Sequence, residues 1–404
     1  MRNTHFLGGL STIVLLLVLL FAPAHAQDQP PLPYTSLEEF QAALDAAISS
    51  GAIDPFWQTL VDAGQMPLIF EDTAVFLYRG TGAQVEWRGD FSNWESNPIY
   101  WGERQGSSDL WMMSHTFAMD TRLDYKIVVG ETEWLLDPLN PYQQLGGYGP
   151  NSELRMPDSR YPEATIPRDT IAHGELSADQ TIDSSYLGYK VNYRVYLPAG
   201  YEELDSLPVM YVADGQDFAH DEMGSMVIVL DNLIADGAIQ PIIAVFVDPR
   251  EVGNPDHNRR QTQFLGNAAY AGFLAEELVT AIDTAYKTDP SADARGVLGI
   301  SFGAVNSTFM AITYPDVFHD IAILSPAFWP VPWMIDSFGT MERLPIKVFL
   351  SMGVIGDDVY NARRLRDNLE SKGYPLLYVE VNDGHSWGNW RGLLDEVLIY
   401  FYGV

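Results

Sequence analysis

The sequence predicts an α/β fold that is preceded by a small all-β domain and a cleaved leader. Three observations support this: an apolar run near the N-terminus, period-two alternation that begins at Thr73, and apolar strands that alternate with helices through the second half. We expect a signal peptide over 1–26, a helical segment over 27–66, a β-sandwich over 67–160 and an α/β domain over 161–404.

Composition excludes several classes of function. The chain has 404 residues, of which 23 are Lys or Arg and 54 are Asp or Glu, giving a net charge of −31. A negative field of this size repels phosphate backbones, so we expect no nucleic-acid partner. Cysteine is absent, which excludes disulfides, thiolate zinc sites and cysteine nucleophiles. Hydrophobic residues make up 47% of the chain, which is enough to form sizeable cores.

The first 26 residues have the pattern of a secretory signal peptide. Arg2 supplies the positive charge, Ile13–Ala22 is apolar, and Ala24-His25-Ala26 fits the rule for a small-residue cleavage site. The apolar run is shorter than the ~20 residues that span a bilayer. We therefore expect cleavage after Ala26, a secreted or periplasmic location and no stable membrane insertion.

Two short helices are predicted before the β domain. Ser36 and Glu39 have the spacing of a capping box, and apolar residues then recur at helical spacing as far as Ile48. A second helix is predicted over Pro55–Ala63. Neither segment contains residues with obvious chemistry, so we interpret both helices as packing elements.

The alternating pattern, which begins at Thr73 and extends over about 75 residues, predicts an antiparallel sandwich. Turn residues separate four alternating segments: AVFLYRG, QVEWRGDFSNW, LWMMSHTFAM and LDYKIVVG. Six of the ten tryptophans lie between Trp57 and Trp134. Three prolines between 157 and 167 indicate a linker, so we place the domain boundary near 160.

The second half alternates strands with helices. Its apolar strands are KVNYRVYLP, LPVMYVADG, PIIAVFVD, RGVLGI, IAILSP, KVFLSMG and LLYVEVN. The amphipathic segment YAGFLAEELVTAIDTAY is the clearest of the intervening helices. Strands that are apolar throughout are buried on both faces, which favours a mostly parallel sheet.

A candidate nucleophile lies in a G-x-S-x-G pattern. Ser301 is the centre of Gly299-Ile300-Ser301-Phe302-Gly303, which follows an apolar strand and precedes a helical segment. This is the context of a nucleophile elbow, in which small flanking residues allow the serine to project above the sheet edge. The alternative is an ordinary turn between strand and helix.

A serine nucleophile needs a base, and two histidines follow Ser301. His385 comes just after the last strand, which is the position of the base in the chain order serine, acid, histidine. His319 lies where the preceding helix ends, and we favour a surface role for it.

The acid is expected after the strand VFLSMG, between nucleophile and base. Asp357 is our choice, and Asp358 is expected to cap the next helix, although the two roles could be exchanged. Asp383 lies too close to His385 in sequence to be a favoured partner, but it stays open as a third candidate. For the oxyanion we expect the N–H of Phe302 and one N–H from the DGQD turn, from either Gln216 or Asp217.

These motifs resemble the esterase branch of the α/β-hydrolases, which includes enterochelin, feruloyl and acetyl-xylan esterases. GISFGA, VADGQDF and DGHSWGNWRG are the segments that carry the resemblance, which covers about 165–404. The first half is similar to the immunoglobulin-like sandwich that precedes the hydrolase domain in enterochelin esterases. WRGDFSNW and LDPLNP also resemble glycogen-binding modules.

The resemblance implies a secreted serine esterase with an α/β-hydrolase fold, in which Ser301 is the nucleophile, His385 the base and Asp357 the acid. It also implies an Arg followed shortly by Glu near 259–263, but this chain has no acidic residue there. Basic residues are sparse for binding a triply anionic ferric siderophore. We expect a siderophore-, feruloyl- or acetyl-type ester as substrate, either small or glycan-linked.

Aromatic residues near the motifs are candidates for contacts with substrate. We assign substrate binding to Trp329, which follows IAILSP together with Phe328 and Trp333, and to Trp387 and Trp390, which flank the histidine. Packing in the core is the alternative for each of them.

Two other functions remain open from the sequence. The sandwich could be the active part of a glycan-binding protein, with Trp94 as the best exposed candidate among Trp87, Trp94, Trp101, Trp111 and Trp134. The same triad could instead transfer an acyl group to an alcohol. No metal-binding motif is recognisable, and we expect no cofactor. The oligomeric state is not predicted.

Overall fold

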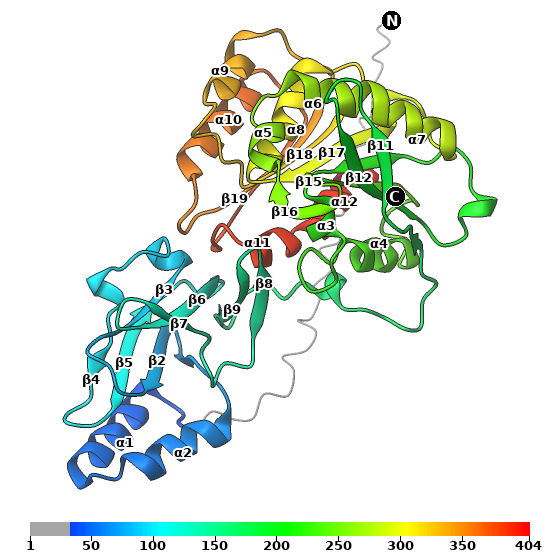
Figure 1. Cartoon of the computed structure of the whole chain (residues 1–404). Coiled ribbons are helices and arrows are strands. Elements are labelled where there is room, and N and C mark those ends of the chain that lie inside the picture. Colours follow the sequence, from blue (N-terminus) through cyan, green and yellow to red (C-terminus); the bar gives the residue numbers. More distant parts are fainter. Residues whose placement is uncertain (1–32) are drawn as a thin grey trace, which may run out of the picture.

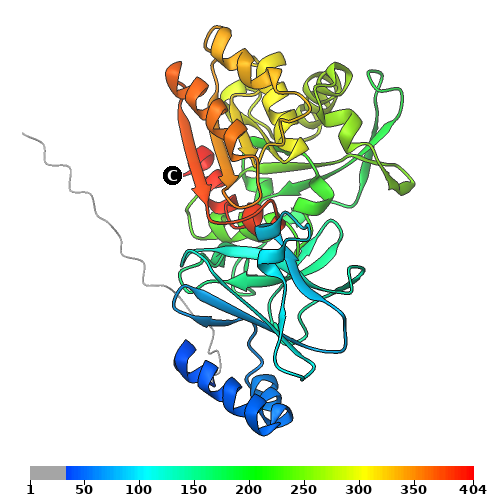
Figure 2. The same cartoon turned by 90° about the vertical axis from the view of Figure 1, so that its left-hand side faces the viewer.

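The computed structural model describes residues 33–404, which form two regions joined near residue 160 (Figure 1). We refer to residues 33–159 as the N-terminal region and to residues 160–404 as the C-terminal region. The expected signal peptide over 1–26 lies outside the described residues. Figure 2 shows the first two helices at the end of the molecule that lies away from the C-terminal region. Within residues 33–404, no helix is both long enough and apolar enough to cross a bilayer.

The N-terminal region begins with helices α1 (Leu37–Ser50) and α2 (Ile53–Ala63). Ser36 Oγ accepts the Glu39 N–H at 3.1 Å, which is one half of the predicted capping box. The other half differs, because the Glu39 carboxylate accepts the N–H of Thr35 instead of the N–H of Ser36. Apolar residues of both helices share a core with one face of the adjoining sheet. The helices therefore act as packing elements.

Two antiparallel sheets follow and face each other across a common core. Trp87 and Tyr125 of one sheet and Phe76 and Trp111 of the other lie in this core. The first sheet has the order β1 (Leu68–Phe70), β2 (Thr73–Arg79), β5 (Leu110–Thr116), β4 (Glu103–Arg104). The second has the order β3 (Val85–Gly89), β6 (Arg122–Val129), β9 (Gly149–Arg155), β8 (Gln143–Gly146), and β7 (Glu133–Leu135) also pairs with β6.

The C-terminal region is built on one large mixed sheet. Its strand order is β10 (Glu175–Leu176), β12 (Lys190–Leu197), β14 (Ile243–Asp248), β13 (Val209–Val212), β17 (Arg295–Ile300), β18 (Asp320–Leu324), β19 (Lys347–Gly353), β20 (Leu376–Val381), and β11 (Gln180–Asp183) pairs with β12. Neighbours from β14 to β20 are parallel, whereas β12 runs antiparallel to β14. The predicted α/β fold with a mostly parallel sheet is confirmed.

Helices cover both faces of this sheet. One face packs on α4 (Met226–Ala235), α11 (Trp387–Arg391) and α12 (Leu394–Tyr402). The other packs on α6 (Ala268–Gly272), the π-helical segment η5 (Phe273–Leu278), α7 (Val279–Ala285), α8 (Phe302–Thr313), α9 (Trp333–Thr340) and α10 (Val359–Ser371). Tyr211 of β13 points to the second face and Met210 to the first, as strand alternation requires. Two covered faces explain why the central strands are apolar throughout.

Smaller elements lie at the carboxyl edge of the sheet. These are α3 (Gly215–Phe218), the hairpin of β15 (Arg250–Glu251) and β16 (Asn254–Asn258), and α5 (Arg260–Phe264). Ser301 follows β17 at this edge, and the loops after β19 and β20 begin there as well. In Figure 1 the same edge faces the N-terminal region, and α11 contacts β6 and β8. Side chains far apart in sequence are thereby brought together.

Candidate active site

Ser301 occupies a strained turn between β17 and α8. Its φ is 54° and its ψ is −117°, a conformation that non-glycine residues rarely adopt. The turn tolerates no side chain at Gly299, because a Cβ there would lie 2.1 Å from the carbonyl of Gly303. The Ser301 N–H is held by the Leu324 carbonyl of the neighbouring strand at 3.0 Å. The geometry is that expected of a nucleophile elbow, in which the surrounding structure maintains the strain.

His385 and Asp357 meet across the loops that follow β20 and β19. His385 Nδ1 lies 2.9 Å from Asp357 Oδ1, and the Asp357 side chain is only 3% exposed. Burial raises the pKa of Asp357, but the hydrogen bond and charge of His385, the Ser325 hydroxyl and the Asp358 N–H outweigh it, so the pKa lies below its ordinary value. An ionised carboxylate only accepts hydrogen bonds, so Nδ1 carries a hydrogen, and in the neutral imidazole the free lone pair is on Nε2.

The neighbouring carboxylate, Asp358, has a different role. It is the N-cap of α10, where its side chain accepts the Asn361 N–H at 3.4 Å and the Asn361 side-chain amide at 2.7 Å. The open choice between the two aspartates thus has a geometric answer: Asp357 faces the histidine, and Asp358 caps the helix.

The other candidates from the sequence lie elsewhere. His319 directly precedes β18, at the opposite edge of the sheet from Ser301, and pairs with Asp293 at 2.6 Å. Asp383 points toward Arg122 of the N-terminal region, and its Oδ1 is buried without a hydrogen-bond partner. Neither side chain forms a hydrogen bond with His385 or Asp357.

Two backbone N–H groups are available near the elbow. Phe302 and Gln216 lie in the first turns of α8 and α3, where helical bonding provides no acceptor for the N–H. The Asp217 N–H, the open alternative to Gln216, donates to the Asp214 carbonyl at 3.0 Å. The two turns touch, since a Cβ on Gly303 would lie 3.1 Å from Asp214 Oδ2. Because the Asp217 N–H already has an acceptor, Gln216 is favoured as the second donor.

Arg260 connects these two turns and was not singled out from the sequence. Its Nε donates to both carboxylate oxygens of Asp214, at 2.8 and 2.9 Å, and its Nη2 donates to the Ile300 carbonyl at 3.0 Å. The guanidinium also lies 5.4 Å from the Phe302 ring centre. The available signal was the arginine expected near 259–263, but only the fold shows that it ties the β13 turn to the elbow.

The predicted aromatic contacts divide into exposed and buried groups. Trp329 is 66% exposed, and its ring centre lies 6.0 Å from that of Phe302, so it can contact a substrate at the elbow. Trp387 and Trp390 are each only 6% exposed and pack on each other in the core. Trp390 also packs edge-on against His385 at 5.0 Å. Their burial counts against a direct substrate contact and favours a supporting role beneath the histidine.

The tryptophans of the N-terminal region also divide. Trp87 and Trp111 are buried in the core between the sheets, so neither can present a face to a glycan. Trp101 and Trp134 are each about 40% exposed. Trp94, expected to be the best exposed candidate, is instead half-buried and stacks on Trp134 with ring centres 6.5 Å apart. Across residues 33–404, no group of three or more acidic or histidine side chains has the arrangement of a metal site.

Comparison with known proteins confirms the esterase resemblance. Residues 184–347 match the family model described as "Putative esterase". The chain is 24% identical over 227 residues to the uncharacterized protein YjcH of Bacillus subtilis, covering 53% of this chain and 92% of that protein. It is 27% identical over 169 residues to an endo-1,4-beta-xylanase/feruloyl esterase of Xylanibacter ruminicola, covering 39% of this chain and 22% of that protein.

Two solved structures share the fold of this chain. The enterobactin esterase of Shigella flexneri, in the presence of enterobactin, has a TM-score of 0.68 at 19% identity and covers 81% of this chain and 92% of its own. The ferric enterobactin esterase of Salmonella typhimurium has the same TM-score and identity and covers 81% of this chain and 93% of its own. Both are esterases of the α/β-hydrolase type, so the predicted hydrolase fold is confirmed.

Proposed function

We propose that this chain, a carboxylic ester hydrolase of the esterase family, cleaves its ester through Ser301, His385 and Asp357. The observation that carries the proposal is the pair of His385 Nδ1 and Asp357 Oδ1 at 2.9 Å, formed by loops at the same sheet edge as the Ser301 turn. The order nucleophile, acid, base along the chain is that of the α/β-hydrolases.

In the proposed reaction, His385 Nε2 takes the hydroxyl proton as Ser301 Oγ attacks the ester carbonyl carbon. The tetrahedral intermediate collapses to an acyl-enzyme, and the alcohol leaves with the proton held by His385. Water then attacks the acyl-enzyme, His385 accepts its proton, and the acid product departs as Ser301 is restored. Asp357 keeps the Nδ1 hydrogen in place and stabilises the imidazolium in both halves of the reaction.

The negative oxygen that develops on the carbonyl would be bound by the N–H groups of Phe302 and Gln216. Phe302 lies in the first turn of α8, whose dipole also favours a negative charge, and Gln216 lies in the single turn of α3. Arg260 supports this arrangement, because it bonds to the acidic side chain of the β13 turn and to the carbonyl just before Ser301.

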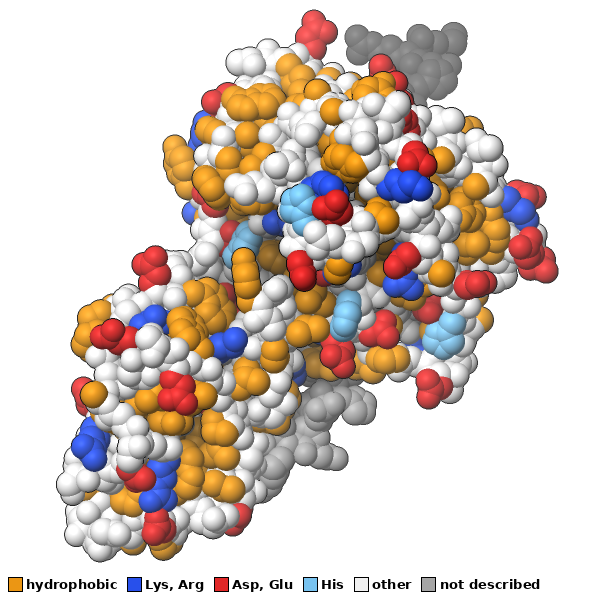
Figure 3. Space-filling model, in the orientation of Figure 1, with side chains coloured by type: hydrophobic (Ala, Val, Ile, Leu, Met, Phe, Trp, Pro, Cys, Tyr) orange, Lys and Arg blue, Asp and Glu red, His pale blue; other side chains and the backbone are white. Residues whose placement is uncertain are grey.

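For the substrate, we favour a neutral aryl or acetyl ester over a ferric siderophore. The chain carries a net charge of −31, and acidic side chains are spread over both regions in Figure 3. This field disfavours a strongly anionic substrate. Trp329, exposed beside Phe302, offers a flat apolar surface to an aromatic acyl group such as a feruloyl group.

We also propose that the paired antiparallel sheets of the N-terminal region form an immunoglobulin-like sandwich.

A further proposal is that the protein is exported. Support for export comes from the leader pattern that ends at Ala26. N-terminal sequencing of protein recovered from the periplasm or medium tests this, and a mature chain that begins at Gln27 is expected. An intact leader on all recovered protein would contradict export by this route.

The triad is tested with Ser301→Ala and the matched control Ser307→Ala. Ser307 lies in α8, the helix that follows Ser301, and is buried, but its hydroxyl bonds only to the Gly303 carbonyl. We expect Ser301→Ala to abolish hydrolysis of short-chain p-nitrophenyl esters and labelling by a fluorophosphonate, and Ser307→Ala to keep both. Equal turnover by wild type and Ser301→Ala would rule out Ser301 as the nucleophile.

A second candidate function is binding of glycan by the N-terminal region. The observation that favours it is the stacked pair of Trp94 and Trp134, because Trp134 is exposed and its ring could pack on a sugar face beside the half-buried Trp94. Retention of the full chain on insoluble polysaccharides should be lost in Trp134→Ala if this surface binds. Lack of retention of the wild-type chain would remove this function and leave the esterase proposal unaffected.

A further inference from the structure

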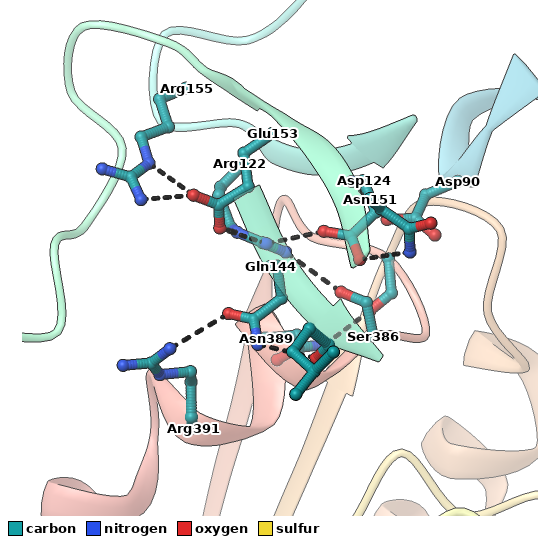
Figure 4. Close-up of polar contacts among 12 residues, drawn as sticks. Asp90, Arg122, Asp124, Gln144, Asn151, Glu153, Arg155, Ser386, Asn389 and Arg391 are labelled. Atoms are coloured by element: carbon teal, nitrogen blue, oxygen red, sulfur yellow. Dashed lines mark hydrogen bonds and ion pairs between the residues drawn. The ribbon is translucent and has the colours of Figure 1, made fainter. Parts of the chain in front are cut away.

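The loop that carries His385 is held from the N-terminal region by one buried arginine (Figure 4). Arg122, the first residue of β6, donates from its backbone N–H to the Asn382 carbonyl at 3.2 Å and from Nη1 to Ser386 Oγ at 3.1 Å. Its guanidinium also fills the space beside Gly388, where a Cβ would lie 1.8 Å from the Arg122 Cζ. Arg122 thus contacts the chain both before and after His385.

Arg122 is itself fixed by carboxylates of the N-terminal region. Its Nη2 bonds to Asp124 at 2.6 Å and to Glu153, and its Nε bonds to Glu153 at 2.8 Å. Glu153 is also bonded by Arg155, and Asp124 accepts from Asn151 at 3.1 Å. Figure 4 shows these side chains converging from β6 and β9 on the turn that contains Ser386. The guanidinium therefore has little rotational freedom.

A second residue of the N-terminal region touches the loops of both the acid and the base. Asp90 lies in the short turn η1 (Asp90–Ser92), and its Oδ2 accepts the Asp124 N–H at 2.8 Å. A Cβ on Gly384 would lie 2.1 Å from Asp90 Cγ, and a Cβ on Gly356 would lie 2.4 Å from the Asp90 carbonyl. These glycines directly precede His385 and Asp357. Both loops are therefore packed against the same turn.

We propose that Arg122 is a positioning residue for His385, so that the N-terminal region completes the catalytic site. The inference rests on the proposed triad. His385 lies on a loop beyond the end of β20, and within its own region it is restrained by Asp357 and by the edge of Trp390. Arg122 adds restraints on both flanks of the imidazole, at Asn382 and Ser386. A displacement of about 1 Å at a catalytic group can cost about a hundredfold in rate.

A role in cohesion between the two regions is the alternative explanation. A buried ionic network can hold two surfaces together without influencing the chemistry, and removing one partner of such a network destabilises the protein. The two roles differ in one measurable property. A positioning role slows the reaction of Ser301 in protein that is still folded, whereas a purely cohesive role changes only the stability.

The test compares Arg122→Gln and Arg122→Lys with Arg88→Gln in the full chain. Arg88 is a matched control, because it also forms a buried ion pair, with Glu86, but contacts no residue of the His385 loop. The readouts are the melting temperature, the rate of fluorophosphonate labelling of Ser301, and kcat and KM for a small p-nitrophenyl ester. Labelling reports the activation of the nucleophile without depending on a substrate pocket.

We expect folded Arg122→Gln to label about a hundredfold more slowly and to lose kcat in proportion, with KM changed by less than about twofold. Arg122→Lys should recover part of the rate, because it keeps the charge but not the forked geometry. Arg88→Gln should label at the wild-type rate. If Arg122→Gln melts below the assay temperature, Ser386→Ala replaces it, since that change removes the Nη1 hydrogen bond and leaves every charge in place.

A wild-type labelling rate in the folded variant, whether Arg122→Gln or Ser386→Ala, would overturn the proposal. The proposal would also be overturned if Arg88→Gln slowed labelling as much as Arg122→Gln does. Any disturbance of the N-terminal region would then slow the reaction, whether or not it touched the His385 loop. Failure of the underlying triad would give a different result: Ser301→Ala would keep its turnover, whatever Arg122 does.

Discussion

Replacing each of two adjacent aspartates by asparagine tests which of them serves the histidine. Asp357 Oδ1 accepts from His385 Nδ1 and from the Asp358 N–H at 2.8 Å, whereas its Oδ2 is buried and has the Ser325 hydroxyl as its neighbour. In Asp357→Asn, the amide nitrogen can take the place of Oδ2 beside the Ser325 hydroxyl, which can accept a hydrogen bond. Both bonds to Oδ1 are then kept, so the substitution removes the negative charge and little else.

The size of the effect follows from that lost charge. At an effective dielectric constant of about 20, opposite charges centred about 4 Å apart attract by about 4 kcal/mol. This attraction acts when the imidazole gains a proton in the transition state, and about 1.4 kcal/mol corresponds to a tenfold change in rate. We therefore expect Asp357→Asn to lower kcat by about a thousandfold, and by about ten thousandfold if the histidine also changes tautomer.

Asp358→Asn is the matched control, because it changes the same charge one residue along the chain. Asparagine is as good an N-cap as aspartate, so α10 should remain capped and kcat should stay within about twofold of wild type. The assay is steady-state hydrolysis of p-nitrophenyl acetate, with fluorophosphonate labelling as a second readout. A comparable loss in the two variants, or an Asp357→Asn variant that retains more than about a tenth of kcat, would refute the assignment.

Three further predictions concern the elbow, the substrate surface and the response to pH. Arg260→Ala should lower kcat by about a hundredfold with little change in KM, because the Phe302 and Gln216 turns lose their common anchor. Steady-state kinetics measure this, and a change in KM alone would contradict the role of Arg260 at the elbow. Trp329→Ala should raise KM for feruloyl esters severalfold while leaving acetyl esters nearly unaffected, and equal effects on both substrates would count against an aryl surface. Burial, together with neighbouring carboxylates, raises the pKa of Asp90 and of Asp383 to about 7, so the folded chain binds protons that the unfolded chain releases between about pH 4 and pH 7. The free energy of unfolding should therefore fall as pH rises from 5 to 8. Thermal melts of wild type and Asp383→Asn across this range measure the fall. If stability depends on pH equally in both proteins, the role of Asp383 is contradicted.

Local patterns in the sequence determined much of the C-terminal region. Apolar strands that alternate with amphipathic helices can bury both faces of a sheet in few ways, so an α/β fold followed from periodicity. The Ser301 turn was recognisable because its strain depends on close neighbours: a strand before it, a helix after it, and glycines on both sides. The caps at Ser36 and Asp358 were likewise predictable from a few adjacent residues.

Contacts between distant parts of the chain were decided by the tertiary structure. Asp357 and Asp358 are equivalent by composition, and only the course of the loop after β19 turns one toward His385 and the other toward α10. The buried positions of Trp387 and Trp390 likewise depend on packing that their sequence neighbours do not specify.

The same limit applies to the two arginines that emerge only from the fold. Arg260 bonds to a carboxylate 46 residues away, and Arg122 bonds to a hydroxyl 264 residues away, so neither contact leaves a periodic trace in the sequence. Periodicity and capping reflect the energetics of neighbouring residues, which any short segment carries with it. Which buried charge meets which loop depends on how the whole sheet and the N-terminal region come together, and that is settled only when the chain has folded.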